Sequence, residues 1–184
     1  SFDSSEVFTN ALASKENMRT QSFAQKLCVS AKGDVDRIKN ATLEDGQKGL
    51  LFSLSNHKVL YANGIYDKVY PASITKIMTA MLALQSGKLD DMVTITQENV
   101  TLEEGSQVCG FVAGDQVTLD QLLHCLLVYS GNDAASAIAE YVGGTTENFV
   151  QMMNDYAARL GCTGTHFTNP HGLQDENHYT TPYD

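Results

Sequence analysis

Ser73 and Lys76 are the residues of this chain whose types and spacing best suit nucleophilic chemistry, and both lie within residues 70–84. A serine hydroxyl reacts at neutral pH only when a neighbouring base takes its proton. A lysine amine can be that base when burial or nearby cations lower its pKa. Positions i and i+3 share a helix face, so a helix that begins near Ser73 places the two groups within hydrogen-bonding reach, near the positive end of its dipole.

The pattern Ser-x-x-Lys is weak by itself, because residues 55–58 match it as well. That second match falls between two alternating runs, at 49–54 and 59–62, which predict the strands of a hairpin with a polar turn. For Ser73 the alternative interpretation is a helix N-cap, followed by a lysine that faces solvent. Other parts of the sequence decide between the two interpretations.

A second candidate group is the turn Ser130-Gly131-Asn132, which lies between two apolar helical patterns. Residues 118–128 begin with a capping box formed by Thr118 and Gln121 and continue with leucines at helical spacing. Residues 133–141 predict the next helix. Because the flanking helices fix where the turn points, its hydroxyl and its carboxamide are presented at one place.

The elements that must position these side chains follow from periodicity and from turn residues. We expect a hairpin at 48–63, a helix from 73 to 87, an extended piece at 93–96, an irregular lobe at 98–115, helices at 118–128, 133–141 and 145–160, and a turn-rich end at 162–184. Towards the N-terminus we expect a mobile arm at 1–21, a strand at 22–30, and a loop with a short helix at 31–46. No internal repeat is visible, and 184 residues fit one domain.

Composition excludes several classes of function. A formal net charge of −10 argues against nucleic acid and anionic membrane surfaces as partners, since both attract basic patches. No stretch has the apolar length of a membrane span. A hydrophobic content of 42% is that of a soluble globular domain with a real core.

Cysteine and histidine spacing predicts no metal site and no cofactor. The four cysteines form no Cys-x-x-Cys pair, and their disulfide pairing stays open; they are Cys28, Cys109, Cys125 and Cys162. No His-Glu-x-x-His is present. His166, His171 and His178 are close in sequence, with Asp175 among them, and we interpret them as structural hydrogen-bonding groups rather than as metal ligands.

Three blocks together resemble a known family; they are Ser73-Ile74-Thr75-Lys76 after Tyr70-Pro71-Ala72, Ser130-Gly131-Asn132-Asp133-Ala134-Ala135, and Asn169-Pro170-His171-Gly172-Leu173. They resemble the serine-type D-alanyl-D-alanine carboxypeptidases, the low-molecular-mass penicillin-binding proteins, from about Thr42 to Asp184. Three ordered blocks are far more specific than one, so the N-cap interpretation of Ser73 loses its support. The resemblance implies an α+β fold of the β-lactamase/transpeptidase kind, with a helical lobe and an incomplete antiparallel sheet.

The resemblance also implies a secreted or cell-surface enzyme that removes the terminal D-alanine from the pentapeptide stems of peptidoglycan and that β-lactam antibiotics acylate. Ser73 would be the nucleophile and Lys76 the general base. Ser130 would relay a proton to the leaving amine, and Asn132 would bind the substrate amide or Lys76. The N–H of Ser73 would be one oxyanion donor.

The chain departs from the family at its third motif, Lys-Thr-Gly, which it lacks; the nearest text, at residues 162–164, has no lysine. In the family this motif supplies the second oxyanion donor and a lysine for the substrate carboxylate. We therefore expect residues 22–184 to be a catalytic domain without its C-terminal strands. Losing one oxyanion donor costs roughly 100- to 1000-fold, so weak activity or none is expected of this chain alone. One sheet edge would be open unless another chain covers it, and membrane attachment would come from a part outside this sequence.

Two other functions stay open. A class A β-lactamase shares the first two blocks but needs a deacylating glutamate in a loop, and Glu140 and Glu147 are expected on helix surfaces instead. A non-catalytic wall-binding or sporulation module would keep the fold and lose the chemistry. Stable labelling by penicillin, lost when Ser73 is replaced, would distinguish the carboxypeptidase from both.

Overall fold

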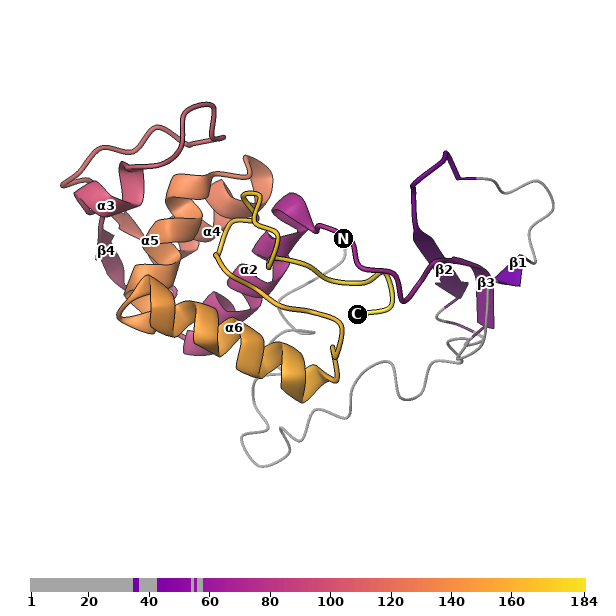
Figure 1. The fold of residues 1–184 in the computed structure, drawn as a ribbon. Coiled ribbons are helices and arrows are strands. Elements are labelled where there is room, and N and C mark those ends of the chain that lie inside the picture. The colour runs from indigo at the N-terminus through magenta and orange to yellow at the C-terminus, as the bar shows by residue number, and fades with distance from the viewer. Residues whose placement is uncertain (1–34, 37–42, 54, 56–57) are drawn as a thin grey trace.

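A computed structural model describes residues 35–36, 43–53, 55 and 58–184 of the chain. Its elements in chain order are β1 (Val35–Asp36), β2 (Gly49–Ser53), β3 (Lys58–Asn63), the 3-10 helix η2 (Ala72–Ile74), α2 (Thr75–Ser86), β4 (Met92–Thr94), α3 (Gln97–Val100), β5 (Gln116–Thr118), α4 (Leu119–Val128), α5 (Asn132–Gly143) and α6 (Thr146–Leu160). The expected arm at 1–21 and strand at 22–30 lie outside the described residues. The α+β class is confirmed, with the helices in one lobe and a sheet beside it (Figure 1).

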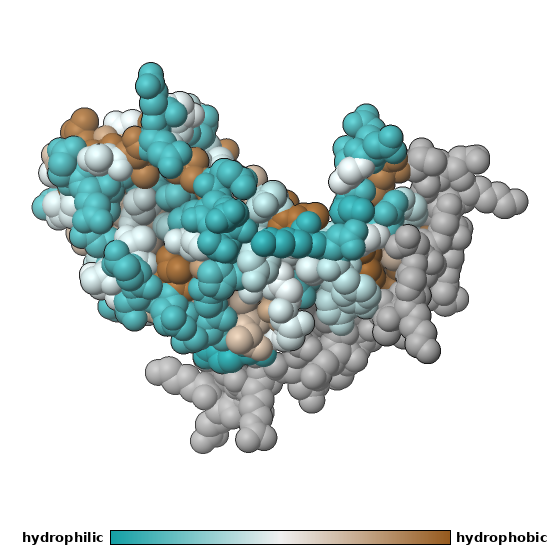
Figure 2. All heavy atoms as spheres, viewed as in Figure 1, coloured by the Kyte–Doolittle hydropathy of each residue, from teal (hydrophilic) through white to brown (hydrophobic). Residues whose placement is uncertain are grey.

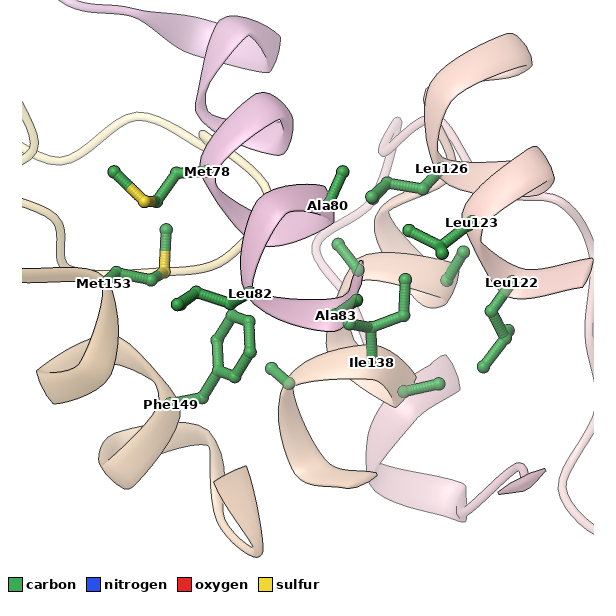
Figure 3. Close-up of a cluster of buried hydrophobic side chains, with 14 of the residues drawn as sticks. Met78, Ala80, Leu82, Ala83, Leu122, Leu123, Leu126, Ile138, Phe149 and Met153 are labelled. Carbon is green, nitrogen blue, oxygen red and sulfur yellow. The ribbon is translucent and has the colours of Figure 1, made fainter. Parts of the chain in front are cut away.

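The helical lobe is organised around α2, which packs against α4, α5 and α6. In Figure 3 the side chains of α4 lie on one side of α2 and those of α6 on the other. The buried side chains that meet there include Leu82 and Ala83 of α2, Leu122 and Leu126 of α4, Ile138 of α5, and Phe149 and Met153 of α6. Each large apolar side chain that is fully buried contributes roughly 1.5–3 kcal/mol, so this core holds α2 in place.

The helix boundaries follow the predicted signals. In the capping box of α4, the Gln121 N–H donates to Thr118 Oγ1 (3.1 Å) and the Thr118 N–H donates to Gln121 Oε1 (2.8 Å). Gly87 and Gly161 end α2 and α6 in the left-handed region, with φ of 67° and 84°. The helix expected from residue 73 begins with the 3-10 turn of η2. The short helix α3 was not expected, since it lies in the stretch predicted to be irregular.

The sheet has the strand order β1-β3-β2 and is antiparallel, so the predicted hairpin is confirmed. The prediction for residues 35–36 was wrong. They were expected to be loop or helix, and instead they form strand β1, which pairs with β3. Within the described residues β2 is an edge strand, bonded to β3 alone. Leu51 is its exposed side chain, and the other four are half-buried. A second two-stranded ribbon pairs β4 with β5.

The C-terminal segment 162–184 connects the helical lobe with the sheet. Thr180 forms an antiparallel β-bridge with Val69, and the Tyr183 N–H donates to the Ile65 carbonyl (2.9 Å). Figure 1 shows this segment, in yellow, running past α2 towards the sheet. Its first half is held against the start of α2, because the carbonyls of Pro170 and His171 accept hydrogen bonds from Thr79 and Lys76. Among the described helices, none combines the length and the hydropathy that a bilayer span requires.

Candidate active site

The turn that leads into α2 exposes Ser73 and buries Lys76 behind it, with only 3% of Lys76 accessible. Lys76 Nζ donates to Ser73 Oγ (3.2 Å) and to the carbonyl oxygen of His171 (2.8 Å). Neither η2 nor α2 has a side-chain cap hydrogen bond, so Ser73 is not a cap and Lys76 does not face solvent. The Ser73 hydroxyl is thus accessible to a ligand and is hydrogen-bonded to the buried amine of Lys76.

Burial sets the charge of this amine. Desolvation disfavours the ammonium form and lowers the pKa of Lys76 from 10.5 to about 8. Both of its hydrogen-bond acceptors are neutral, and among the described residues no carboxylate forms an ion pair with it. A pKa near 8 leaves roughly one amine in ten uncharged at pH 7. Lys76 can therefore accept a proton under ordinary conditions.

A loop far along the chain completes the surroundings of Lys76. Within it, Asn169 Oδ1 accepts from the N–H of Gly172 (2.7 Å), which folds the loop tightly. The Pro170 carbonyl accepts from Thr79 Oγ1 (2.6 Å), and the His171 carbonyl accepts from Lys76. The block that carried part of the resemblance is thus docked on the first turns of α2. No sequence signal indicates this main-chain contact.

Two buried imidazoles support the same region. The backbone N–H of Thr168 donates to His178 Nδ1 (3.0 Å), so in the neutral ring Nε2 carries the hydrogen and lies 2.7 Å from Thr75 Oγ1. Burial lowers the pKa of His178, and burial together with the charge of Lys76 lowers the pKa of His171 to about 4. Both rings are therefore neutral at pH 7. No cluster of His, Cys, Asp or Glu in the described part of the chain has the geometry of a metal site.

The Ser130-Gly131-Asn132 turn joins α4 to α5, both of which pack against α2. Ser130 has a φ of 62°, which is uncommon for a residue with a side chain. Asn132 is buried, and its N–H donates to the Gln107 carbonyl (2.7 Å). Hydrogen bonds between described residues link neither Ser130 nor the Asn132 side chain to Ser73 or Lys76. The turn and the Ser73–Lys76 pair therefore lie in the same packed lobe, but no hydrogen bond between described residues joins the side chains of the turn to the pair.

Asp133 holds this turn in place, a role that its position in the Ser130–Ala135 block does not reveal. It is 1% exposed, and its carboxylate accepts the backbone N–H groups of Cys109 (2.9 Å), Gly110 (3.0 Å) and Ala134 (2.9 Å). The positive end of the α5 dipole favours a carboxylate at this position. Asp133 thereby ties the segment around residue 109 to the start of α5. The sequence signal was an acidic residue in the first turn of a helix.

We expect the change Asp133→Asn to lower the free energy of unfolding by roughly 1.5–3 kcal/mol. An amide places an NH₂ group against N–H donors that now meet a carboxylate oxygen. Urea denaturation measures the loss. Asp120→Asn is the matched control, because Asp120 is the first-turn acid of α4 but is exposed, so its change should stay within about 0.5 kcal/mol. Equal losses in the two variants would contradict the role of Asp133.

Solved structures place this fold in a class. DacD of Francisella tularensis, a D-alanyl-D-alanine carboxypeptidase, matches with a TM-score of 0.71 and 34% identity, over 83% of this chain and 38% of that chain. Penicillin binding protein 5 of Haemophilus influenzae matches with a TM-score of 0.64 and 37% identity, over 69% of this chain and 39% of that chain. The fold is that of the penicillin-binding, transpeptidase-like proteins.

Sequence comparison narrows the class to a family. The family model described as D-alanyl-D-alanine carboxypeptidase matches residues 38–184, and the chain belongs to this family. The D-alanyl-D-alanine carboxypeptidase DacF of Bacillus subtilis is 38% identical over 159 residues, which cover 84% of this chain and 40% of that protein. DacC of Escherichia coli is 38% identical over 150 residues, 76% of this chain and 37% of that protein. The chain thus spans about two fifths of the length of these relatives.

Proposed function

We propose that the protein is a serine peptidase that removes the terminal D-alanine from peptidoglycan stem pentapeptides through an acyl-enzyme. The observation that carries this proposal is the exposed Ser73 hydroxyl 3.2 Å from the buried Lys76 amine. Family membership supplies the substrate class. In this proposal residues 22–184 belong to the catalytic domain.

Ser73 Oγ attacks the carbonyl carbon of the bond between the two D-alanines, and Lys76 takes the hydroxyl proton. The negative charge on the carbonyl oxygen is stabilised by the N–H of Ser73. When the bond breaks, Ser130 passes the proton from Lys76 to the nitrogen of the departing D-alanine. Asn132 donates to the substrate amide or to Lys76 and keeps the two in register. Water then hydrolyses the ester on Ser73.

The His171 carbonyl orients the base in this scheme. As an ammonium, Lys76 donates to both Ser73 Oγ and the His171 carbonyl. After losing one proton, the amine can keep its bond to the His171 carbonyl and turn its lone pair towards the Ser73 hydroxyl. A carbonyl that only accepts thus fixes the direction of the lone pair.

Release of D-alanine from a diacetylated Lys-D-Ala-D-Ala peptide tests the proposed reaction, and intact mass after benzylpenicillin tests the acyl-enzyme. A stable adduct with slow turnover is expected. Rapid penicillin hydrolysis would instead indicate a β-lactamase. That alternative finds no support in the glutamates, because Glu140 accepts from Thr96 Oγ1 and Asn99 Nδ2 (2.9 and 2.6 Å) and Glu147 is exposed on α6.

The rate of acylation by penicillin is expected to rise roughly 50-fold from pH 6 to pH 8 and then to level off. The reason is that the uncharged fraction of Lys76 grows as the pH passes its pKa of about 8. His171, with a pKa of about 4, does not titrate in this window. A fluorescent penicillin measures the rate at each pH.

Two variants give the controls for this pH profile. Lys88→Ala removes an exposed lysine just past the end of α2, and it should leave the profile unchanged. Lys76→Ala should leave a residual rate, about 100- to 10,000-fold lower, without the rise. A wild-type rate that is flat from pH 6 to pH 9 would show that Lys76 is not the base.

The proposed substrate places the protein outside the cytoplasm, and β-lactam antibiotics would acylate Ser73 as mimics of the D-Ala-D-Ala end.

We also propose that another polypeptide segment covers the edge of β2. A groove of about 570 Å³ lies beside this strand, lined by Gly49 and Leu50 and by residues of α2 and α6. Protection from hydrogen exchange of those β2 amides that do not bond to β3 would support such pairing, and fast exchange of the same amides would oppose it.

A further inference from the structure

Two thiols lie at the base of the Ser130-Gly131-Asn132 turn, outside the residues used by the proposed reaction. Cys109 comes from the segment between α3 and β5, and Cys125 from α4. Cys109 Sγ lies 3.7 Å from the backbone oxygen of Cys125. Both residues are half-buried and carry free thiols. The fold therefore brings together two cysteines that are 16 positions apart in the sequence.

The same atoms support the turn itself. The Gly131 N–H donates to the Cys125 oxygen that Cys109 Sγ contacts (3.2 Å). A Cβ on Gly131 would collide with Cys109 Sγ, so the thiol lies directly against the turn. Two residues before Cys109, the Gln107 carbonyl accepts from the N–H of Asn132 (2.7 Å). A movement of Cys109 is thus transmitted to the turn through both packing and hydrogen bonds.

We propose that Cys109 and Cys125 are a redox modification site, in which an intrachain disulfide shifts the Ser130–Asn132 turn and slows the acylation of Ser73. The effect on acylation rests on the proposed function, whereas formation of the bond does not. The co-reactant is a small-molecule disulfide of the oxidised glutathione type. The pair thereby gives the cleft a response to the thiol–disulfide balance around the protein.

The bond forms by two exchange steps. The Cys125 thiolate attacks one sulfur of oxidised glutathione and expels one glutathione thiolate. The Cys109 thiolate then attacks Cys125 Sγ in the mixed disulfide and expels the second. The two protons lost by the cysteines go to the two glutathiones, so two protein thiols and one disulfide give one protein disulfide and two small thiols.

The surroundings of Cys109 make it a poor first nucleophile. Burial, the carboxylate of Asp133 and contact with the Cys125 thiol raise the pKa of Cys109 to about 12. A thiol that is so rarely ionised is a slow nucleophile towards a disulfide in solution, so we place the attack of Cys125 first. In the mixed disulfide the Cys125 sulfur is already held beside Cys109, and this proximity offsets the small thiolate fraction of Cys109. The disulfide carries no proton to lose, and it removes the thiolate charge that Asp133 would repel.

Oxidation is expected to displace the turn because a disulfide holds two sulfurs closer than a thiol contact does. Cys109 Sγ and Cys125 Sγ must move towards each other, and the segment that bonds to Asn132 moves with Cys109. Small displacements of positioning groups have large effects on rate. We expect acylation by fluorescent penicillin to slow about threefold or more. The disulfide should also raise the midpoint of thermal unfolding by roughly 6–12 °C.

The test incubates the protein in glutathione buffers of graded redox potential, followed by alkylation and peptide mapping. The expected result is a Cys109–Cys125 peptide pair that appears together with the fall in acylation rate. In Cys125→Ser the rate should not depend on the redox potential. The matched control is Cys162→Ser, a half-buried thiol just past the C-terminal end of α6, which should respond as the wild type does.

Each alternative result is decisive. Alkylation of both Cys109 and Cys125 under oxidising buffer, or linkage of either one to Cys28 or Cys162, would overturn the proposal. A mapped Cys109–Cys125 bond with an unchanged acylation rate would also overturn it, since the turn would not respond. Absence of acylation in every buffer would count against the proposed function instead, and peptide mapping would still decide whether the bond forms.

Discussion

The variant Ser73→Ala is expected to show no covalent adduct after incubation with benzylpenicillin, and to lose at least about 10⁴-fold in the rate of D-alanine release. The hydroxyl lies 3.2 Å from the Lys76 amine and faces solvent, and no other group in the described turn offers an oxygen nucleophile to that amine. Without it the acyl-enzyme cannot form. Intact mass spectrometry reads the result directly, because the acylated protein gains the mass of one penicillin.

Ser55→Ala is the matched control for this experiment. Ser55 begins the second Ser-x-x-Lys match of the sequence and is exposed in the turn between β2 and β3. Its replacement should leave the adduct and the rate unchanged. Labelling that persists in Ser73→Ala, or that disappears in Ser55→Ala, would show that the nucleophile has been assigned to the wrong serine. Circular dichroism of both variants establishes that each is folded.

Those features of the site that depend on neighbours in sequence could be predicted. The spacing of Ser73 and Lys76 on one helical turn follows from the period of the helix. The capping box of Thr118 and Gln121 is likewise a local interaction, formed by residues three apart. For this reason the helices and the hairpin were predicted nearly in place.

What could not be predicted depends on partners that are distant in sequence. Lys76 meets the carbonyl of His171, which lies 95 positions away. Burial by such distant segments lowers the pKa of Lys76, and no local pattern encodes either the contact or the burial. From the sequence, Asp133 is simply an acidic residue in the first turn of a helix. In the structure it accepts hydrogen bonds from backbone N–H groups that begin at Cys109, 24 positions earlier. Strand β1 was missed because only pairing with β3 makes its two residues a strand.

The tight approach of the 169–173 loop to the start of α2 leads to the second large effect, expected for Gly172→Ala. Gly172 has a φ of 91°, and a Cβ at this position would overlap the backbone carbonyl of Ala72, next to Ser73. Backbone cannot rotate away as a side chain can, so the loop must move. Strain and displacement together should lower the free energy of unfolding by about 2–5 kcal/mol. Because the loop carries the His171 carbonyl, acylation should slow as well.

Gly87→Ala separates the two causes of this loss. Gly87 also has a left-handed φ, of 67°, but a Cβ there meets no atom within 4 Å. Its replacement should therefore carry the strain alone, about 1–2 kcal/mol, and leave the acylation rate unchanged. Urea denaturation and penicillin labelling of both variants measure the difference. If Gly172→Ala lost no more stability than Gly87→Ala and kept the wild-type rate, the loop would not be what holds Lys76 and Ser73 in their observed positions.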